Sequence, residues 1–269
     1  MNRSYQLVWN AALRLVQVSS EITRRGCAHT AAASCPVTAH GRRRALVVAL
    51  GLGLAAPGGV AFAAILPSGP VVTSGAATIT AGPDTLTVAQ AAGAMTIDWT
   101  SFQIGPGGAV VLTQPTGSRA DHRVTGATAT QIDGSLNAQG TQSLFNGNGI
   151  TLGSTARVVS DYLVLNTQST GQAVTLSAGA TVTGTPIDSS LELFGATIRT
   201  DADVTVYDFR TTAWRDNIVQ AQGVITAEQV EATAAGDVHL DGYNRINRLS
   251  ASAVATSPFA ARAIFSWGH

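Results

Sequence analysis

Short runs in which apolar and polar residues alternate follow one another through most of the chain, from residue 64 to about residue 255. The clearest runs are Asp84–Val88, Met95–Trp99 and Asp201–Tyr207, and after the second run the phase shifts to Phe102 and Ile104. A period of two places the apolar side chains on one face of an extended chain, so each run predicts a half-buried strand. No long window in this region keeps a helical period, and the sequence therefore predicts an all-β fold.

Turn-forming residues separate the predicted strands, at Gly105–Gly108, Asp133-Gly134 and Asn146–Gly149. A sandwich, a barrel and a parallel β-helix all fit this pattern. Short strands, abundant small polar residues and the echo between Ala178–Val182 and Gly195–Ile198 favour the β-helix, whose stacked units bury faces that none could bury alone. At roughly 22 residues per coil and about 4.8 Å between coils, about eight or nine coils would make a rod about 40 Å long.

Charge divides the chain into two segments. Up to Ala63 there are seven arginines and one glutamate, and from Ala64 onward nine arginines and fifteen acidic residues, with no lysine anywhere. The larger segment is acidic and has no basic patch, which argues against nucleic acid as a partner. Both cysteines, Cys27 and Cys35, lie in the basic segment. Disulfide scaffolds and cysteine-bound metals are therefore excluded for the remainder.

The basic segment ends in the three parts of a secretory signal. Arg42–Arg44 form a positive region, Ala45–Ala56 an apolar run of twelve residues, and Ala61 and Ala63 stand where signal peptidase accepts small residues. The run is too short to span a bilayer, which needs about 20 residues. We expect cleavage after Ala63, so that Ala64 becomes the first residue of the mature chain.

The residues ahead of this signal form an unusual extension. Tyr5, Val8, Trp9, Leu13, Val16 and Ile22 recur at helical spacing between arginines. This spacing predicts a basic amphipathic helix, and a mitochondrial transit peptide is an alternative interpretation. Residues 1–10 (MNRSYQLVWN), followed by residues 18–21 (VSSE), resemble the extended signal peptide region of type V secreted proteins of Gram-negative bacteria. The resemblance implies slow translocation across the inner membrane and a passenger that stays unfolded in the periplasm.

A second resemblance covers residues 66–158. It rests on LPSG at 66–69, DTLTV at 84–88, IDWTSFQIG at 97–105, VLTQP at 111–115, RVTG at 123–126, QIDGSLNAQG at 131–140 and LFNGNGI at 144–150. These motifs are similar, in order, to the filamentous haemagglutinin amino-terminal domain, which is the two-partner secretion domain. The resemblance implies a right-handed parallel β-helix with an N-terminal cap.

The same resemblance implies partners and one candidate motif. The expected partner is an outer-membrane β-barrel transporter with periplasmic receptor domains, and a ligand on a host or neighbouring cell would serve an adhesin-like exoprotein. The family's secretion motif is Asn-Pro-Asn-Gly, where this chain has Asn146, Gly147, Asn148 and Gly149. Proline fixes φ whereas glycine loosens the turn, by about 0.5–1 kcal/mol, so transporter recognition would be weaker.

These observations predict a leader at 1–63, a two-partner secretion domain at 64–158, further β-helix repeats at 159–256 and an atypical tail at 257–269. The tail abandons the strand pattern. A natural cap and a frameshifted end both fit it, and a truncated remnant of a large adhesin is an alternative to a short secreted exoprotein.

Three groups of residues invite a chemical interpretation, and a structural one is favoured for each. Asp237, His239 and Asp241 share one strand face, either as a metal or acid–base site or as a solvent-facing strand with Val238 and Leu240 inward. Asp201 and Asp203, beside Arg199, would carry the activity of a β-helical polysaccharide-degrading enzyme. Asp121–Arg123 are expected in a surface loop, and Trp99 in the core or the cap. We expect no catalytic residue, cofactor or metal.

Overall fold

The computed structural model describes residues 5–10, 15–20, 64–91, 93–167, 170–185, 187–253 and 263–265. The chain divides into two compact units, Met1–Gly58 and Gly59–His269. No helix occurs among the described residues, so none of them forms a helix that could cross a membrane.

In the first unit, β1 (Tyr5–Asn10) and β2 (Leu15–Ser20) pair antiparallel, from Tyr5 opposite Ser20 to Asn10 opposite Leu15. The prediction of an amphipathic helix is therefore wrong for these residues. Tyrosine, tryptophan and valine favour strands, and this preference outweighs a helical spacing that only a few residues support.

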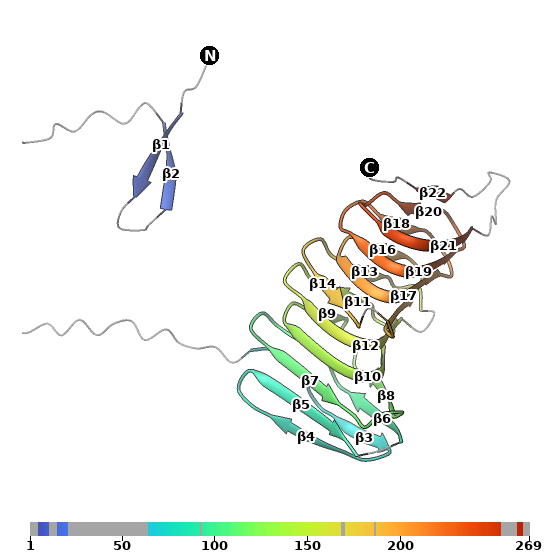
Figure 1. Cartoon of the computed structure of the whole chain (residues 1–269). Helices are drawn as coiled ribbons and strands as arrows, with labels where there is room; N and C mark the ends of the chain where they lie inside the picture. The colour runs from blue at the N-terminus through green and yellow to red at the C-terminus, as the bar shows by residue number, and fades with distance from the viewer. Residues whose placement is uncertain are drawn as a thin grey trace, which may run out of the picture. The chain divides into compact units, whose positions relative to one another are not determined.

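The second unit is a parallel β-helix in which the coils contribute strands to three faces (Figure 1). Face 1 contains β5 (Thr85–Gln90), β7 (Ala109–Thr113) and β14 (Thr181–Thr183); face 2 contains β6 (Ala94–Trp99), β8 (Arg119–Val124) and β15 (Ser190–Gly195). Five longer strands bend from face 1 onto face 2: β10 (Ser135–Phe145), β12 (Arg157–Asn166), β17 (Asp203–Ala213), β19 (Ile225–Ala234) and β21 (Arg245–Ala253). Face 3 contains β9 (Thr130–Ile132), β11 (Ile150–Leu152), β13 (Val174–Leu176), β16 (Ile198–Thr200), β18 (Ile218–Gln220), β20 (Val238–Leu240) and β22 (Ala263–Phe265).

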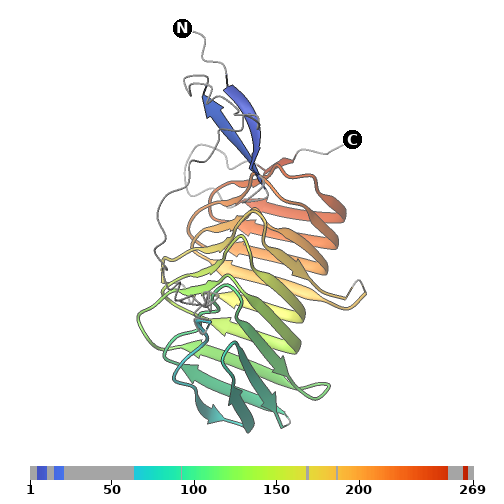
Figure 2. The same ribbon diagram turned by 90° about the vertical axis from the view of Figure 1, so that its left-hand side faces the viewer.

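About eight coils stack in this way, as the sequence predicts, and strands of successive coils lie side by side (Figure 2). The predicted all-β parallel β-helix is confirmed, and the sandwich and the barrel are excluded. The right hand of the coil stays a prediction from the resemblance.

Aliphatic side chains stack along the inside of face 1. Strand register places one such residue of each coil over the next, in the order Leu86, Val110, Leu136, Val158, Val182, Val204 and Ile225. All seven are at most 3% exposed. Burial of a side chain of this size stabilises the fold by about 1.5–3 kcal/mol, so the ladder is a large part of the core.

The predicted N-terminal cap is present. β3 (Val71–Ser74) pairs antiparallel with β6, and β4 (Ala77–Ala81) pairs antiparallel with β5 (Figure 1). Two antiparallel strands thus cover the first coil, and the partly buried Val72, Ala77 and Ile79 pack against the core beneath them. Trp99 is fully buried and meets Phe102 edge to face at 5.4 Å, which confirms its predicted core position.

The proposed echo between Ala178–Val182 and Gly195–Ile198 does not relate equivalent positions. The first segment leads into β14 on face 1, whereas the second leads into β16 on face 3. Coils also differ in length: 20 residues separate Ile132 from Leu152, and 24 separate Leu152 from Leu176, although these residues are stacked in register. Unequal coils hide the true repeat from a search at a fixed period.

Candidate functional site

The predicted secretion motif forms the turn between faces 2 and 3 of the third coil. Asn146 directly follows β10 and its side chain is fully buried. Its Nδ2 donates to Thr128 O (3.0 Å) and Thr130 Oγ1 (2.9 Å), and its Oδ1 accepts from Asn148 N (2.9 Å). The amide thus closes its own turn and ties it to the preceding coil.

The other residues of the motif complete these links. Asn148 Nδ2 donates to Gly126 O at 2.8 Å, and Thr170 Oγ1, on the following coil, donates to Gly147 O. Gly149 N donates to Asn146 O at 3.2 Å, and Gly149 is the glycine of this turn that has a positive φ, 106°. The motif therefore joins three consecutive coils, and only the side chain of Asn148 is exposed. Its role in secretion stays a prediction.

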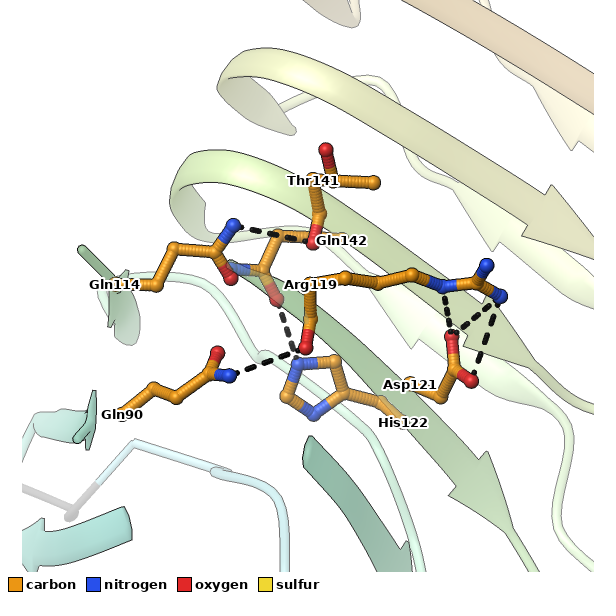
Figure 3. Close-up of polar contacts among 7 residues, drawn as sticks. All are labelled: Gln90, Gln114, Arg119, Asp121, His122, Thr141 and Gln142. Atoms are coloured by element: carbon orange, nitrogen blue, oxygen red, sulfur yellow. Dashed lines mark hydrogen bonds and ion pairs between the residues drawn. The ribbon is translucent and has the colours of Figure 1, made fainter. Parts of the chain in front are cut away.

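A chain of hydrogen-bonded polar side chains runs outward from the core, and Figure 3 shows three of its members, His122, Gln142 and Gln114. Trp99 Nε1 donates to His122 Nδ1 at 3.1 Å, and His122 Nε2 donates to Gln142 Oε1 at 2.9 Å. Gln142 Nε2 then donates to Gln114 Oε1 at 3.0 Å. Because Nδ1 accepts, the histidine is the neutral tautomer with its proton on Nε2.

The prediction of a surface loop at Asp121–Arg123 is wrong. These residues belong to β8, where His122 points inward and is 1% exposed. Asp121 points outward and pairs with Arg119, at 3.1 Å between Nη2 and Oδ1. Charged neighbours in sequence suggested a loop, but alternation along the strand buries the middle residue of the three.

Burial governs the titration of His122. Desolvation lowers the pKa of His122 below its ordinary value of 6.5, and the hydrogen bond with Gln142 and the charge of Asp121 only partly oppose this. The imidazole therefore stays neutral in the folded protein at pH 7.

Two glutamines satisfy carbonyls where faces 1 and 2 meet, and sequence reasoning missed them. Gln90 Nε2 donates to Gly93 O (2.6 Å) and to Arg119 O (3.1 Å) of the next coil. Gln114 Nε2 repeats the pattern one coil later, with Ser118 O (2.6 Å) and Thr141 O (3.3 Å) (Figure 3). Gln90 is the last residue of β5 and Gln114 directly follows β7, and this shared position after an alternating run is the one signal that the sequence offered.

Asp201 and Asp203 hold turns together. Asp201 Oδ1 accepts from Ala221 N (2.8 Å) and Gln222 N (3.1 Å), and its Oδ2 accepts from Arg199 Nε (2.6 Å). Burial raises the pKa of Asp201, but these hydrogen bonds outweigh it, so the pKa lies below its ordinary value. Asp203 Oδ1 accepts from Val224 N at 3.1 Å. Both carboxylates therefore bind the turn of the following coil.

The Asp237, His239 and Asp241 group adopts the expected strand geometry. Val238 and Leu240 are buried, while His239 points outward with its Nε2 3.8 Å from Asp237 Oδ2. Among the described residues, no group of three or more histidine, cysteine, aspartate or glutamate side chains is arranged to hold a metal ion.

The predicted cleavage site lies at the start of the second unit. Ala61 and Ala63 are outside the described residues, whereas Ala64 contacts the first coil. Its backbone nitrogen donates to Asp84 Oδ1 at 3.1 Å.

A hollow of about 920 Å³ lies outside the bend between faces 1 and 2. Its lining includes the loop of residues 114–118 and, on the opposite part, residues 185, 187 and 188. Val159, Tyr162 and Ile187 in the lining are 53%, 36% and 83% exposed, and the Tyr162 hydroxyl donates to Asp188 Oδ1. The hollow thus combines apolar surface with carboxylates.

These features define a class: a capped parallel β-helix that follows a secretory leader. Comparison with known families gives the particular family. The chain belongs to the TPS secretion domain family, which matches residues 63–260. Residues 1–57 match the Extended Signal Peptide of Type V secretion system. The protein is therefore a type V secreted protein, as the leader predicts.

Two proteins of Haemophilus influenzae are similar to this chain, one over a short stretch and the other at low sequence identity. An 88-residue stretch is 40% identical to a heme/hemopexin-binding protein of Haemophilus influenzae, covering 32% of this chain and 10% of that protein. The match thus spans about a tenth of that relative's length. The HMW1 secretion domain from Haemophilus influenzae is similar over 67% of this chain and 76% of that chain, with a TM-score of 0.44 and 14% identity.

Replacing Gly147 with proline should stabilise the fold. Gly147 is the second residue of the turn, where proline is favoured, and the positive φ falls at Gly149 instead. We expect Gly147→Pro to raise the free energy of unfolding by about 0.4–1 kcal/mol, measured by urea denaturation of the secreted protein. Gly149→Pro is the matched control and should destabilise, because its φ is incompatible and its N–H is bonded. Equal effects of the two prolines would contradict this account of the turn.

The buried histidine predicts acid sensitivity. The unfolded state binds a proton on His122 at about pH 6.5, whereas the folded state binds it only at lower pH, so stability falls as pH drops below about 6.5. The limiting loss is about 1.4 kcal/mol per pH unit, measured as the denaturation midpoint between pH 7.5 and 5. His122→Gln should flatten this dependence. An unchanged slope in His122→Gln would refute the assignment.

Proposed function

We propose that the capped β-helix is an export signal recognised by an outer-membrane β-barrel transporter with periplasmic receptor domains. In this proposal its role is recognition and secretion rather than catalysis. Membership of the TPS secretion domain family and the leader support the pathway. The observation that carries the recognition mode is the outer edge of the N-terminal cap.

The edge strand β4 contains no charged residue, proline or bulge, the features that usually protect an edge strand from pairing with another chain. β4 pairs with β5 on one side, and no strand among the described residues pairs with its other side. From Ala64 to Pro83 the chain contains no charged residue. Exposed edge strands in soluble proteins normally carry charges, prolines or bulges that prevent pairing with other chains. An edge strand free of charge is thus suited to pairing with a partner.

The strand at the opposite end of the stack carries charged residues. β21 pairs with β19 and carries Arg245 and Arg248, and Arg248 Nη2 lies 4.0 Å from Glu228 Oε1. Because β4 carries no charge and β21 carries two arginines, strand addition is favoured at β4, at the end of the stack that follows the leader. Strand addition draws its affinity from main-chain hydrogen bonds. A periplasmic receptor strand could therefore bind β4 with few specific side-chain contacts.

The Asn146–Gly149 turn supports this edge indirectly. It joins the second, third and fourth coils, and the second coil pairs with the first coil, on which the cap rests. Folding of the later coils outside the cell would bias export outward, because a folded rod cannot slide back through the transporter.

Placing charge on the free edge should prevent recognition without unfolding the domain. Thr78 and Thr80 of β4 are exposed. We expect the double substitution Thr78→Lys and Thr80→Lys to reduce binding to the isolated periplasmic domains of the transporter at least tenfold, and to reduce secretion in parallel.

The matched control adds the same charges at the other end, as Ser250→Lys and Ser252→Lys on β21, where both serines are exposed. This variant should bind and be secreted normally. Loss of binding in both variants, or in neither, would contradict recognition through the cap edge.

A second candidate function is adhesion, and the hollow outside the bend favours it. Its exposed Tyr162 offers an aromatic face, and Asp161 and Asp188 place carboxylates beside it. The strands beneath are already paired with their neighbours, so a ligand must be recognised by side chains. We propose a neutral or positively charged surface glycan, which combines apolar sugar faces with hydroxyl and amino groups.

Removing the aromatic ring tests this assignment. Tyr162→Ala should lower binding of the secreted protein to glycan-bearing cells severalfold, and Tyr162→Phe should retain most of it, because the ring provides the contact. Tyr243→Ala is the control, since Tyr243 is 78% exposed but lies outside the hollow. Equal binding by wild type and Tyr162→Ala in a cell-binding assay would refute the role of the hollow.

A further inference from the structure

The first two residues of the expected mature chain are held against the corner of the first coil. Ala64 N donates to Asp84 Oδ1 at 3.1 Å, and Ile65 O accepts from Gly105 N at 2.8 Å. Asp84 precedes β5, and Gly105 lies in the turn that leads to β7. Residues 64 and 65 therefore bridge the beginning and the end of one coil.

Two glycines make room for this bridge. A Cβ atom at Gly105 would lie 3.1 Å from Ile65 Cβ, and one at Gly108 would lie 3.3 Å from Ala64 Cβ, both tighter than ordinary contact. The position of Ala64 is thus set by backbone packing as well as by its hydrogen bond with Asp84.

We propose that Asp84 is the binding site of the α-ammonium group that cleavage after Ala63 creates. This inference rests on the proposed cleavage site. Hydrolysis adds water across the Ala63–Ala64 peptide bond: Ala63 leaves with a carboxylate, and the nitrogen of Ala64 takes up a proton and becomes an ammonium group. The contact with Asp84 then changes from a hydrogen bond of a neutral amide to a charge-assisted ion pair.

The ion pair that forms when the leader is cleaved strengthens the attachment of the cap to the stack. The backbone oxygen of Asp84 accepts from Ala109 N at 2.8 Å, so the residue that binds the new terminus is itself tied to the second coil. Asp133, at the corner between β9 and β10, has a different partner, because its Oδ1 accepts from Gln131 Nε2 at 3.1 Å. Asp84 is therefore the carboxylate in direct contact with the new terminus.

The composition of the chain makes the test specific. With no lysine in the sequence, the mature chain has one primary amine, at its N-terminus. We would purify the secreted protein, identify its first residue by mass spectrometry, label the amine by reductive methylation with ¹³C-formaldehyde, and titrate the methyl resonance by NMR.

The α-amino group ordinarily titrates at about 7.7–8.0, and a carboxylate in contact raises its pKa. We expect the pKa of the wild-type amine to exceed that of Asp84→Asn by about half a unit, with the difference shrinking in 1 M salt. Asp133→Asn, the matched control on the next corner, should titrate like the wild type.

The possible failures are distinguishable. Equal pKa values in wild type and Asp84→Asn, with Ala64 as the first residue, would overturn the Asp84 site and leave the cleavage proposal intact. A first residue other than Ala64 would overturn the cleavage proposal and the inference with it.

Discussion

Parallel pairing between successive coils is the constraint on which the rest of the structure depends. Each inward residue lies directly over its equivalent in the coils before and after it. A change in the size or polarity of one inward side chain therefore alters the packing in both neighbouring coils. Aliphatic residues satisfy this constraint along face 1, from Leu86 to Ile225. Backbone groups inside the stack are satisfied by neighbouring coils, and only the two ends leave edges to be covered.

The buried polar residues that link coils are hydrogen-bonded, because an unpaired buried polar group costs about 1–3 kcal/mol. His122 and Gln142 satisfy each other inside face 2, and Asn146 and Asp201 tie the turns of adjacent coils. These residues link coils as the aliphatic ladder does, but with fixed geometry. The secretion motif predicted from sequence belongs to this set, so its structural role and any recognition role are coupled.

Alternation within single strands was readable from sequence, and it placed Leu86, Ile97 and Trp99 in the core correctly. Relations between coils were not readable, because loops such as residues 114–118 and 187–189 change coil length and disguise the repeat. His122 was misplaced because its charged neighbours resemble a loop, whereas the phase set by Ala120 and Val124 buries it. The glutamines at the bend were missed for a related reason: each acts on a carbonyl of the next coil, a partner that sequence spacing does not identify.

The N-terminal end combines two features that would conflict in an ordinary soluble domain. Its cap shields the apolar interior of the first coil, yet its outer strand carries no charge that would deter pairing. A firm attachment of the cap to the first coil reconciles them, because an edge can accept a partner strand only if it is not itself peeled away. The Ser68–Ser101 bridge and the Ile65–Gly105 hydrogen bond provide such an attachment from the backbone. The contact between Ala64 and Asp84 extends it to the bond where the leader is proposed to be removed, which couples completion of the cap to processing.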